Sequence, residues 1–566
     1  MKKLIKLLPK IMMLILAMVL VFSLVACSGL GGGSENGQNQ NNGNTDNPGG
    51  NENPGGNENP GGNENPGGNE NPGGNENPGG NENPGGNENP GGNENPGGNE
   101  NPGGNGNQEH QWTENELFWD ADKNGIPDWQ EKEITLTYAT WQYNNPEAVT
   151  IDTLLIEAFM EKYPNITVTM DIVGEDTEWE TNMLARLETE DIPDVFLVRR
   201  LENMLPYNIL ADITAYYNHD DDTKYLFDSV KDLGIYDGKR YCIPTFIYPE
   251  IWIVNLDLLE RSNIVTPKYD WTWEQMESIA KAVADANATS KVIGLYGADE
   301  YYFELPKILK LRADANAGKK WLAYGYDGEK FNFSDNAYIT AVGKMETGLA
   351  EGWLVNALSE DQLFEMYGSI DDPRYAGNVA IWRQPSWEFK DHADDLLFDW
   401  DVYPGPSGVT GGNTDIAGIS VFCEEKAAAY QLLKWMSFGE DGMVTRYELY
   451  DEYHDELYVS ANNYPYPVVD YGIDGHGVNK IWDNIPYTST ADGYGAPEFV
   501  ESLRNGAIKA NKEVIGWDAA EDKFKEYIYE IVMNGAHYTT LYETIQEAAD
   551  LELRSKREAL AEALGK

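Results

Sequence analysis

The chain has 566 residues, of which 24% are charged and 12% aromatic, and it carries a net charge of −54 at pH 7. A surface this negative repels the phosphates of nucleic acids and of anionic lipid headgroups, so both are excluded as binding partners. The three cysteines and six histidines are too few and too scattered to form a Cys/His metal site.

The first 27 residues have the pattern of a bacterial export signal. Lysines precede an apolar run, Ile11–Val25, which is shorter than the roughly 20 residues needed to cross a bilayer. The run ends in Ala26-Cys27, and the small residue before the cysteine resembles a lipobox. The resemblance implies that residues 1–26 are a signal peptide and that Cys27 carries a diacylglycerol. We therefore expect a protein attached only by this lipid to the extracellular face of the cytoplasmic membrane; the alternative is an uncleaved N-terminal helix.

Residues 27–111 have the composition of a tether. Nine consecutive Asn-Glu-Asn-Pro-Gly-Gly repeats run from Asn51 to Gly104. They offer no apolar side chains to bury, and their regular Pro and Gly oppose helix and strand alike, so we predict a disordered segment. A flexible chain of about 85 residues reaches roughly 50 Å, enough to hold a domain away from a membrane. A repeat that recruits a component of the cell wall is the alternative.

The segment 112–133 contains the spacing of a calcium-binding loop. Oxygen ligands without sulfur or imidazole suit Ca²⁺, and Gly125 allows the sharp turn that such a loop needs. Pro127 has no N–H to bridge a partner loop, so we predict an isolated, structural site rather than a paired one. A solvated acidic turn is the alternative. The predicted ligands are Asp120, Asp122, Asn124, the carbonyl of Ile126, Asp128 and Glu131.

From Ile134 onward, strand and helix periodicities alternate. Apolar residues at every second position predict strands at 134–139 and 166–172, and a nearly continuous apolar run predicts a third at 194–198. Between these strands, apolar residues at helical spacing predict helices at 151–159 and 179–187. This alternation predicts an α/β sheet with crossover helices. Further strands are predicted at 241–243, 379–381 and 416–422, and a helical C-terminus from residue 518.

Short motifs follow one another in a characteristic order between Ile134 and Leu564. They are Pro193–Phe196, Tyr236–Pro244, Asn255–Leu259, Trp271–Glu274, Ala376–Trp382, Asp401–Pro406 and Lys426–Ala429. Each is weak alone, but their order and spacing resemble the family 1 extracellular solute-binding proteins of bacterial carbohydrate ABC importers.

This resemblance implies a periplasmic-binding-protein-like fold over residues 134–566, in which two α/β lobes joined by a hinge close on a ligand. It implies a carbohydrate ligand, a membrane permease as partner, and no enzymatic activity. We expect an oligosaccharide rather than a monosaccharide, because 16 tryptophans and 34 tyrosines offer several aromatic platforms. We also expect a monomer.

The candidate ligand-binding residues follow predicted strands or lie in these motifs. Trp141 follows the first strand, where open α/β sheets bind ligands. The resemblance implies that the loop with Trp382 and Trp387 faces the cleft from the second lobe. Neighbours on a strand point to opposite faces, so at most one of Arg199 and Arg200 is expected in the cleft. The predicted set is Trp141, Arg199, Tyr248, Glu250, Trp382, Trp387, Asn413 and Asp415, whereas Trp271, Trp273 and Trp435 are predicted core.

Several alternatives remain open at this level. Cys242 and Cys423 lie in apolar runs and are predicted to be buried strand residues, although a disulfide between them is an alternative. No His-Glu-x-x-His, Gly-x-Ser-x-Gly or phosphate-loop motif occurs, but abundant acids leave a secreted glycoside hydrolase as a rival. A carbohydrate-binding adhesin or sensor, or a receptor for a polyamine, would also fit.

Overall fold

The computed structural model describes residues 111–356, 358–388, 396–453, 466–471, 496–504 and 515–565. All of them fall within one compact unit, Asn105–Lys566. The predicted signal peptide, Cys27 and the repeats lie outside the described residues. Within the described part, no helix is long and apolar enough to cross a membrane.

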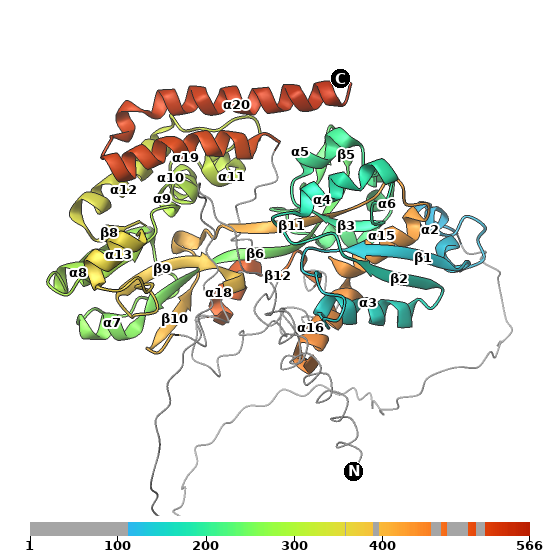
Figure 1. The fold of residues 1–566 in the computed structure, drawn as a ribbon, viewed down its shortest axis with the longest axis horizontal. Helices are drawn as coiled ribbons and strands as arrows, with labels where there is room; N and C mark the ends of the chain where they lie inside the picture. The colour runs from blue at the N-terminus through green and yellow to red at the C-terminus, as the bar shows by residue number, and fades with distance from the viewer. Residues whose placement is uncertain are drawn as a thin grey trace, which may run out of the picture. The chain divides into compact units, whose positions relative to one another are not determined.

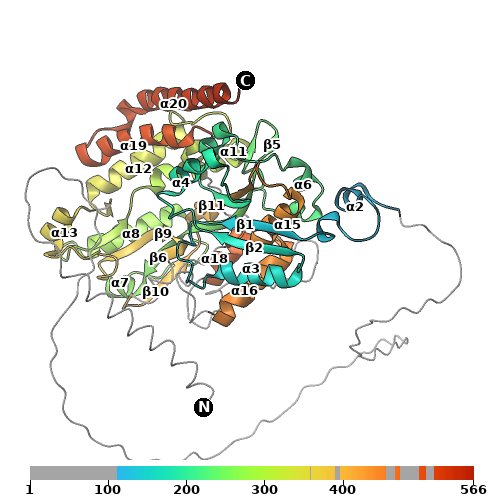
Figure 2. The ribbon, with the colours of Figure 1, turned by 45° about the vertical axis from the view of Figure 1, so that its right-hand side comes forward.

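The first lobe is built on one half of a ten-stranded sheet (Figure 1). β1 (Ile134–Ala139) lies between β2 (Ile166–Asp171) and β3 (Val195–Val198) and is parallel to both, which confirms the predicted strand–helix alternation. Both views place α3 (Ile151–Lys162) and α16 (Glu440–Tyr453) together beside β2 (Figures 1 and 2). Other elements here are α2 (Glu114–Trp119), α4 (Trp179–Ala185), α5 (Leu201–Met204), α6 (Thr214–Asn218), β4 (Ile235–Tyr236), β5 (Lys239–Arg240), α15 (Lys426–Met436) and β12 (Tyr466–Pro467).

The second lobe carries the other half of the sheet. β9 (Val379–Pro385) is antiparallel to β6 (Cys242–Asn255) and parallel to β7 (Ile293–Tyr296), which in turn pairs with β8 (Leu354–Val355). α20 (Tyr542–Ala563) lies alongside α19 (Trp517–Asn534), which confirms the predicted helical C-terminus (Figure 2). The remaining elements are α7 (Leu256–Arg261), α8 (Trp273–Ala286), α9 (Glu300–Phe303), α10 (Leu305–Ala313), α11 (Ala315–Lys320), α12 (Asn336–Glu351), α13 (Glu360–Tyr367), β10 (Trp400–Tyr403) and α18 (Ala496–Arg504).

Side-chain caps explain where key helices begin. Thr272 accepts a hydrogen bond from the N–H of Gln275 at 3.2 Å, and the Gln275 side chain accepts one from the N–H of Thr272 at 2.8 Å. This reciprocal pair satisfies two N–H groups that the first turn of α8 leaves unbonded. Helix α8 thus begins within the motif Trp271–Glu274. Thr150 and Thr153 form the same type of box at the start of α3.

The two half-sheets share the long strand β6. Residues Cys242–Pro249 pair with β11 (Gly412–Ile419), which also borders β3 of the first lobe. The rest of β6, Glu250–Asn255, pairs with β9 and β10 of the second lobe. The chain thus passes between lobes along β6 and returns along β11 (Figure 1). The predicted fold of two α/β lobes joined by a hinge is confirmed.

The buried core forms two apolar clusters, one that extends from the first lobe into the second, where it includes Ile293 and Val379, and one within the second lobe. One apolar cluster contains Phe159, Phe196 and Trp435, and a second contains Trp273 and Phe524. Trp271, Trp273 and Trp435 are 2%, 0% and 7% exposed, so their predicted core role is confirmed.

The two cysteines outside the signal are buried and unbonded to each other. Cys242 begins β6, as predicted. Cys423 is not in a strand: β11 ends at Ile419, and the N–H of Cys423 instead closes a turn onto the carbonyl of Ser420 at 3.3 Å. The alternative of a disulfide between Cys242 and Cys423 is therefore wrong for this structure.

Candidate ligand-binding site

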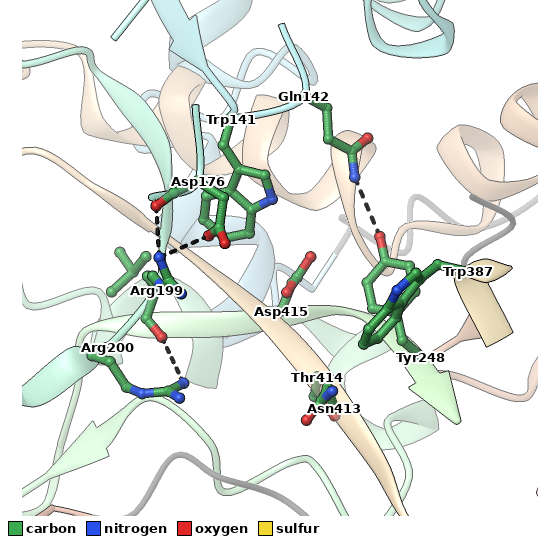
Figure 3. Close-up of a pocket in the computed structure, with 11 residues that line it drawn as sticks. Trp141, Gln142, Asp176, Arg199, Arg200, Tyr248, Trp387, Asn413, Thr414 and Asp415 are labelled. Atoms are coloured by element: carbon green, nitrogen blue, oxygen red, sulfur yellow. Dashed lines mark hydrogen bonds and ion pairs between the residues drawn. The ribbon is translucent and has the colours of Figure 1, made fainter. Parts of the chain in front are cut away.

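A cavity of about 440 Å³ opens at the ends of β1 and β3, beside the strands that join the lobes (Figure 3). Its volume lies within the range of small-molecule sites, roughly 300–1,000 Å³. The carboxyl ends of parallel strands are where open α/β sheets place ligands. The lining residues are Trp141, Gln142, Asp176, Val198, Arg199, Arg200, Tyr248, Trp387, Asn413, Thr414 and Asp415.

Three aromatic side chains from different elements enclose this cavity. Trp141 follows β1 in the first lobe, Tyr248 lies on the shared strand β6, and Trp387 lies in the turn after β9. The rings of Tyr248 and Trp387 meet edge to face, with centroids 5.8 Å apart. Trp141 is held in the same manner by Trp179, at 5.5 Å. Within the described chain, the indole N–H groups of Trp141 and Trp387 have no hydrogen-bond acceptor, so both can donate to a ligand.

The floor of the cavity consists of consecutive polar residues on β11, Asn413, Thr414 and Asp415 (Figure 3). The hydroxyl of Thr414 is buried and bonds to none of the described residues. Asp415 likewise has no hydrogen-bond or ion-pair partner for its carboxylate in the described chain. Burial, and then the nearby carboxylate of Asp176, raise the pKa of Asp415 to about 7, against a smaller lowering by Arg200. Buried polar groups normally have partners, so this floor is prepared for a hydrogen-bonding ligand.

A bulge in the joining strands sets the position of Asp415. Asp415 stands opposite Phe246, but the next residue, Ile416, stands opposite Pro244, so Thr245 is the extra residue on β6. The Thr245 hydroxyl donates to the backbone carbonyl of Asp415 at 3.1 Å. Bulges turn side chains away from strict alternation, and they recur beside functional sites.

The two arginines at the end of β3 both reach the cavity. Arg199 Nη1 lies 3.3 Å from Asp176 Oδ1 and donates to the Asp176 carbonyl at 2.7 Å. Arg200 Nε lies 2.5 Å from Asp518 Oδ2. The expectation that only one would reach the cavity is wrong, because β3 ends at Val198 and strand alternation does not extend to this pair.

Six of the eight predicted residues therefore line one cavity, and two lie elsewhere. Trp382 is completely buried, and its Nε1 donates to Gln384 Oε1 at 3.0 Å. Glu250 is held inside the joint between the lobes, 3.3 Å from Arg383 Nη1. Both residues lie a few positions from cavity residues in sequence, Trp382 from Trp387 and Glu250 from Tyr248, but neither lines the cavity.

Sequence reasoning missed Gln142, Asp176 and Thr414. Gln142 and Thr414 are direct neighbours of predicted residues, so extending the set by one position would have found them. Asp176 lies in the loop before α4, and its approach to Arg199 depends on tertiary structure that no local pattern reports.

Behind the cavity, the buried Glu300 and Glu304 and the partly buried Glu250 surround Arg383 of β9. Arg383 Nε lies 2.5 Å from Glu300 Oε1, and Glu304 accepts a hydrogen bond from the N–H of Gly411, the residue before β11. Burial raises the pKa of Glu300 well above its usual range and that of Glu304 to about 7, although Arg383 opposes both shifts. This joint cluster, Glu250, Glu300, Glu304 and Arg383, connects α9, β6, β9 and the start of β11.

The predicted calcium loop is folded around its acidic side chains. Oxygens of Asp120, Asp122 and Asp128 lie within 4.8 Å of one another. Asp120 accepts hydrogen bonds from the N–H groups of Asn124 and Gly125, at 3.1 and 2.7 Å, and Gly125 has a φ of +88°. Ca²⁺–oxygen distances of about 2.3–2.6 Å allow ligand oxygens to be this close, so the donor set fits the ion.

Solved structures share this fold at low sequence identity. An ABC substrate-binding protein from Listeria monocytogenes in complex with cycloalternan is 21% identical, with 77% of this chain and 100% of that one covered and a TM-score of 0.50. The cyclic α-maltosyl-1,6-maltose binding protein of Arthrobacter globiformis is 15% identical over 75% and 100%, with a TM-score of 0.55. The sugar-binding protein MalE of Xanthomonas citri is 16% identical over 75% and 98%, with a TM-score of 0.54.

The family is established by sequence. The model of the bacterial extracellular solute-binding proteins matches residues 144–438, more than half of the chain, and includes most of the cavity and the whole of β6 and β11. These are binding proteins rather than enzymes, and they act outside the cytoplasm. The chain belongs to the bacterial extracellular solute-binding protein family.

Proposed function

We propose that the protein binds an oligosaccharide between its lobes and delivers it, chemically unchanged, to the permease of an ABC importer. The observation that carries this proposal is the cavity with Trp141 and Tyr248 beside one lobe, Trp387 beside the other, and an unsatisfied polar floor on β11. Aromatic faces suit the apolar faces of sugar rings, and amide, hydroxyl and carboxylate groups suit their hydroxyls.

The similar structures guide the choice of sugars to be tested. One of them is in complex with cycloalternan, and another is named as a binding protein for cyclic α-maltosyl-1,6-maltose. Linear and cyclic α-linked glucose oligosaccharides are therefore the first candidates, beside β-linked ones.

Lipid attachment at Cys27 and a tether over residues 27–111 complete the proposal. A lipid-anchored receptor would remain beside its membrane partner, and a flexible tether would let it turn to collect ligand and dock. The sequence patterns described above support this arrangement, and we propose that the receptor works as a monomer.

We propose further that Asp120, Asp122, Asn124, Ile126, Asp128 and Glu131 hold a structural Ca²⁺. The loop is tied to the first lobe at Trp129, whose carbonyl accepts a hydrogen bond from Asn165 at 3.0 Å. A bound ion would neutralise the acidic side chains and stiffen the entry into β1.

Calorimetric titration of the purified protein with this oligosaccharide panel tests the proposed function, with chromatography of each sugar afterwards. Saturable binding with every sugar recovered intact is expected. Shorter products would establish a glycoside hydrolase instead, and binding of polyamines without binding of sugars would contradict the carbohydrate assignment.

A further inference from the structure

Both arginines of the cavity are already neutralised by aspartates. Arg199 is paired with Asp176, and Arg200 with Asp518 at the start of α19. Arg200 also donates to the backbone carbonyl of Arg199 at 3.1 Å, which helps to hold the Arg200 guanidinium in place (Figure 3). An anionic group on a ligand would therefore share either guanidinium group with an aspartate, which weakens the net attraction that it feels.

The remaining charge of the cavity is the carboxylate of Asp415. Asp415 lies on β11 between the aromatic walls, and Figure 3 shows its side chain pointing into the space between Trp141 and Tyr248. Its backbone is fixed by the Thr245 bulge, so it cannot easily move away from a bound ligand. Among the charged residues that line the cavity, it alone has no partner of opposite charge within the described chain.

We infer that the cavity selects saccharides without negative charge, because its arginines are occupied and the carboxylate of Asp415 is left to receive hydroxyl donors. This inference rests on the proposed function and specifies its ligand class. Neutral sugar hydroxyls can donate to Asp415, to which a hydrogen bond is stronger than to a neutral acceptor. A uronate or phosphate group near this site would face a fixed like charge in partly desolvated surroundings.

Three versions of one sugar separate charge from size. The probes are the tightest neutral member of the oligosaccharide panel, its counterpart with a hydroxymethyl group oxidised to a carboxylate, and its counterpart with a 2-hydroxyl replaced by an amine. Titrations are run at pH 8, where Asp415 is ionised, and at high ionic strength, so that the net charge of the whole chain is screened. We expect the acid to bind about tenfold or more weakly than the neutral sugar, and the amine to bind at least as well.

Two substitutions and one control locate the effect. Asp415→Asn keeps the shape of the side chain but removes the charge, so it should reduce the discrimination between neutral and acidic probes at least about threefold. Asp176→Asn removes the partner of Arg199 and should strengthen binding of the acidic probe. Glu157→Gln, an exposed position on α3 far from these residues in sequence, changes the net charge equally and should leave the discrimination unchanged.

The outcomes distinguish this inference from the proposed function. If the acidic probe binds as well as the neutral one, or if Asp415→Asn leaves their ratio unchanged, the inference is overturned while the saccharide receptor stands. An amine that binds as weakly as the acid would also overturn it, because size and not charge would then decide. If acidic oligosaccharides alone bind, the ligand class is wrong, and if no saccharide of any kind binds, the proposed function fails and the inference fails with it.

Discussion

Trp387 is the residue through which the second lobe contributes to the cavity. It lies in the turn after β9 and is only partly buried, with its ring against Tyr248 at 5.8 Å. Trp387→Ala should weaken saccharide binding by about 2 kcal/mol, roughly 30-fold, because a ring face is lost from a water-excluding contact.

The same substitution should leave folding almost unchanged, and calorimetry beside thermal unfolding measures both effects. Trp112→Ala is the matched control, since Trp112 is also partly buried but does not line the cavity. Equal losses of affinity in the two variants would remove Trp387 from the ligand contact.

Asp415 should make binding depend on pH. Its pKa is raised to about 7 in the free protein, chiefly by burial. Ligand hydroxyls favour the ionised carboxylate and lower this pKa, so binding releases a proton and affinity rises as pH increases from 6 to 8. Calorimetry in buffers of different ionisation enthalpy would detect the released proton, and Asp415→Asn should abolish it. A pH-independent affinity in the wild-type protein would contradict this role.

Most of the cavity residues could be anticipated, because ligands of α/β sheets bind beside strand ends and Trp141 follows the first strand. The same rule could not show that Trp387 lines the cavity and that Trp382 does not. Only four residues lie between them, but Trp382 is buried within β9, whereas Trp387 follows the end of the strand. The pairing of Asp176 with Arg199 likewise joins segments whose approach no local periodicity reports.

At the scale of elements, β6 shows what sequence periodicity misses. The predicted strand stopped at Ile243, immediately before Pro244. Neither Pro244 nor Pro249 has an N–H to donate to a strand ladder. In the fold, Pro244 lies beside the bulge at Thr245, and Pro249 lies opposite Gly412, the first residue of β11. Each proline therefore falls where the ladder with β11 is interrupted or ends, and the strand continues across the joint.

The joint cluster should make stability depend on pH. Burial raises the pKa of Glu304 to about 7, whereas an unfolded glutamate titrates near 4.3. The folded state therefore binds more protons between these values, and stability falls as pH rises from about 5 to 7. Arg383 Nε and Glu300, the carboxylate of Glu250 and the N–H of Gly411 are the groups that face this site.

Glu304→Gln keeps an acceptor for the N–H of Gly411 but cannot take up the proton. The fall in melting temperature between pH 5.5 and pH 8 should be smaller in this variant by about 3 °C or more. Glu157→Gln on the exposed face of α3 serves as the control. If the melting temperature falls by the same amount between pH 5.5 and pH 8 in the wild-type and Glu304→Gln proteins, Glu304 is ionised throughout this range.

The acidic loop before β1 should respond to Ca²⁺. At a concentration 100 times the dissociation constant, a ligand of the folded state stabilises it by about 2.7 kcal/mol, which raises the melting temperature. Asp120→Asn should abolish this increase, because Asp120 is the most buried of the three clustered aspartates. Mg²⁺ at equal concentration is the control, since it fits a smaller, octahedral site. An unchanged melting temperature in Ca²⁺ would favour the solvated acidic turn.

At the scale of the whole molecule, the two lobes are joined through β6 and β11, and one apolar cluster extends from the first lobe into β7 and β9 of the second. A ligand can shift the equilibrium between an open and a closed arrangement of the lobes only if it binds the closed arrangement better. Trp387 gives the ligand a reason to prefer the closed form. Trp141 lies on the first-lobe side of the cavity and Trp387 on the second-lobe side, so a ligand that contacts both rings holds the two sides together. Strand–helix alternation predicted an α/β sheet, and the family resemblance implied two lobes, but the pairing of β11 between β3 and β6 emerged only in the fold.

The most direct test is a crystal structure of the protein with the tightest-binding oligosaccharide of the panel. We predict an intact sugar stacked on Trp387, with a hydroxyl within hydrogen-bond distance of Asp415 and the two lobes closer together than here. A sugar bound outside this cavity, or one cleaved within it, would contradict the account.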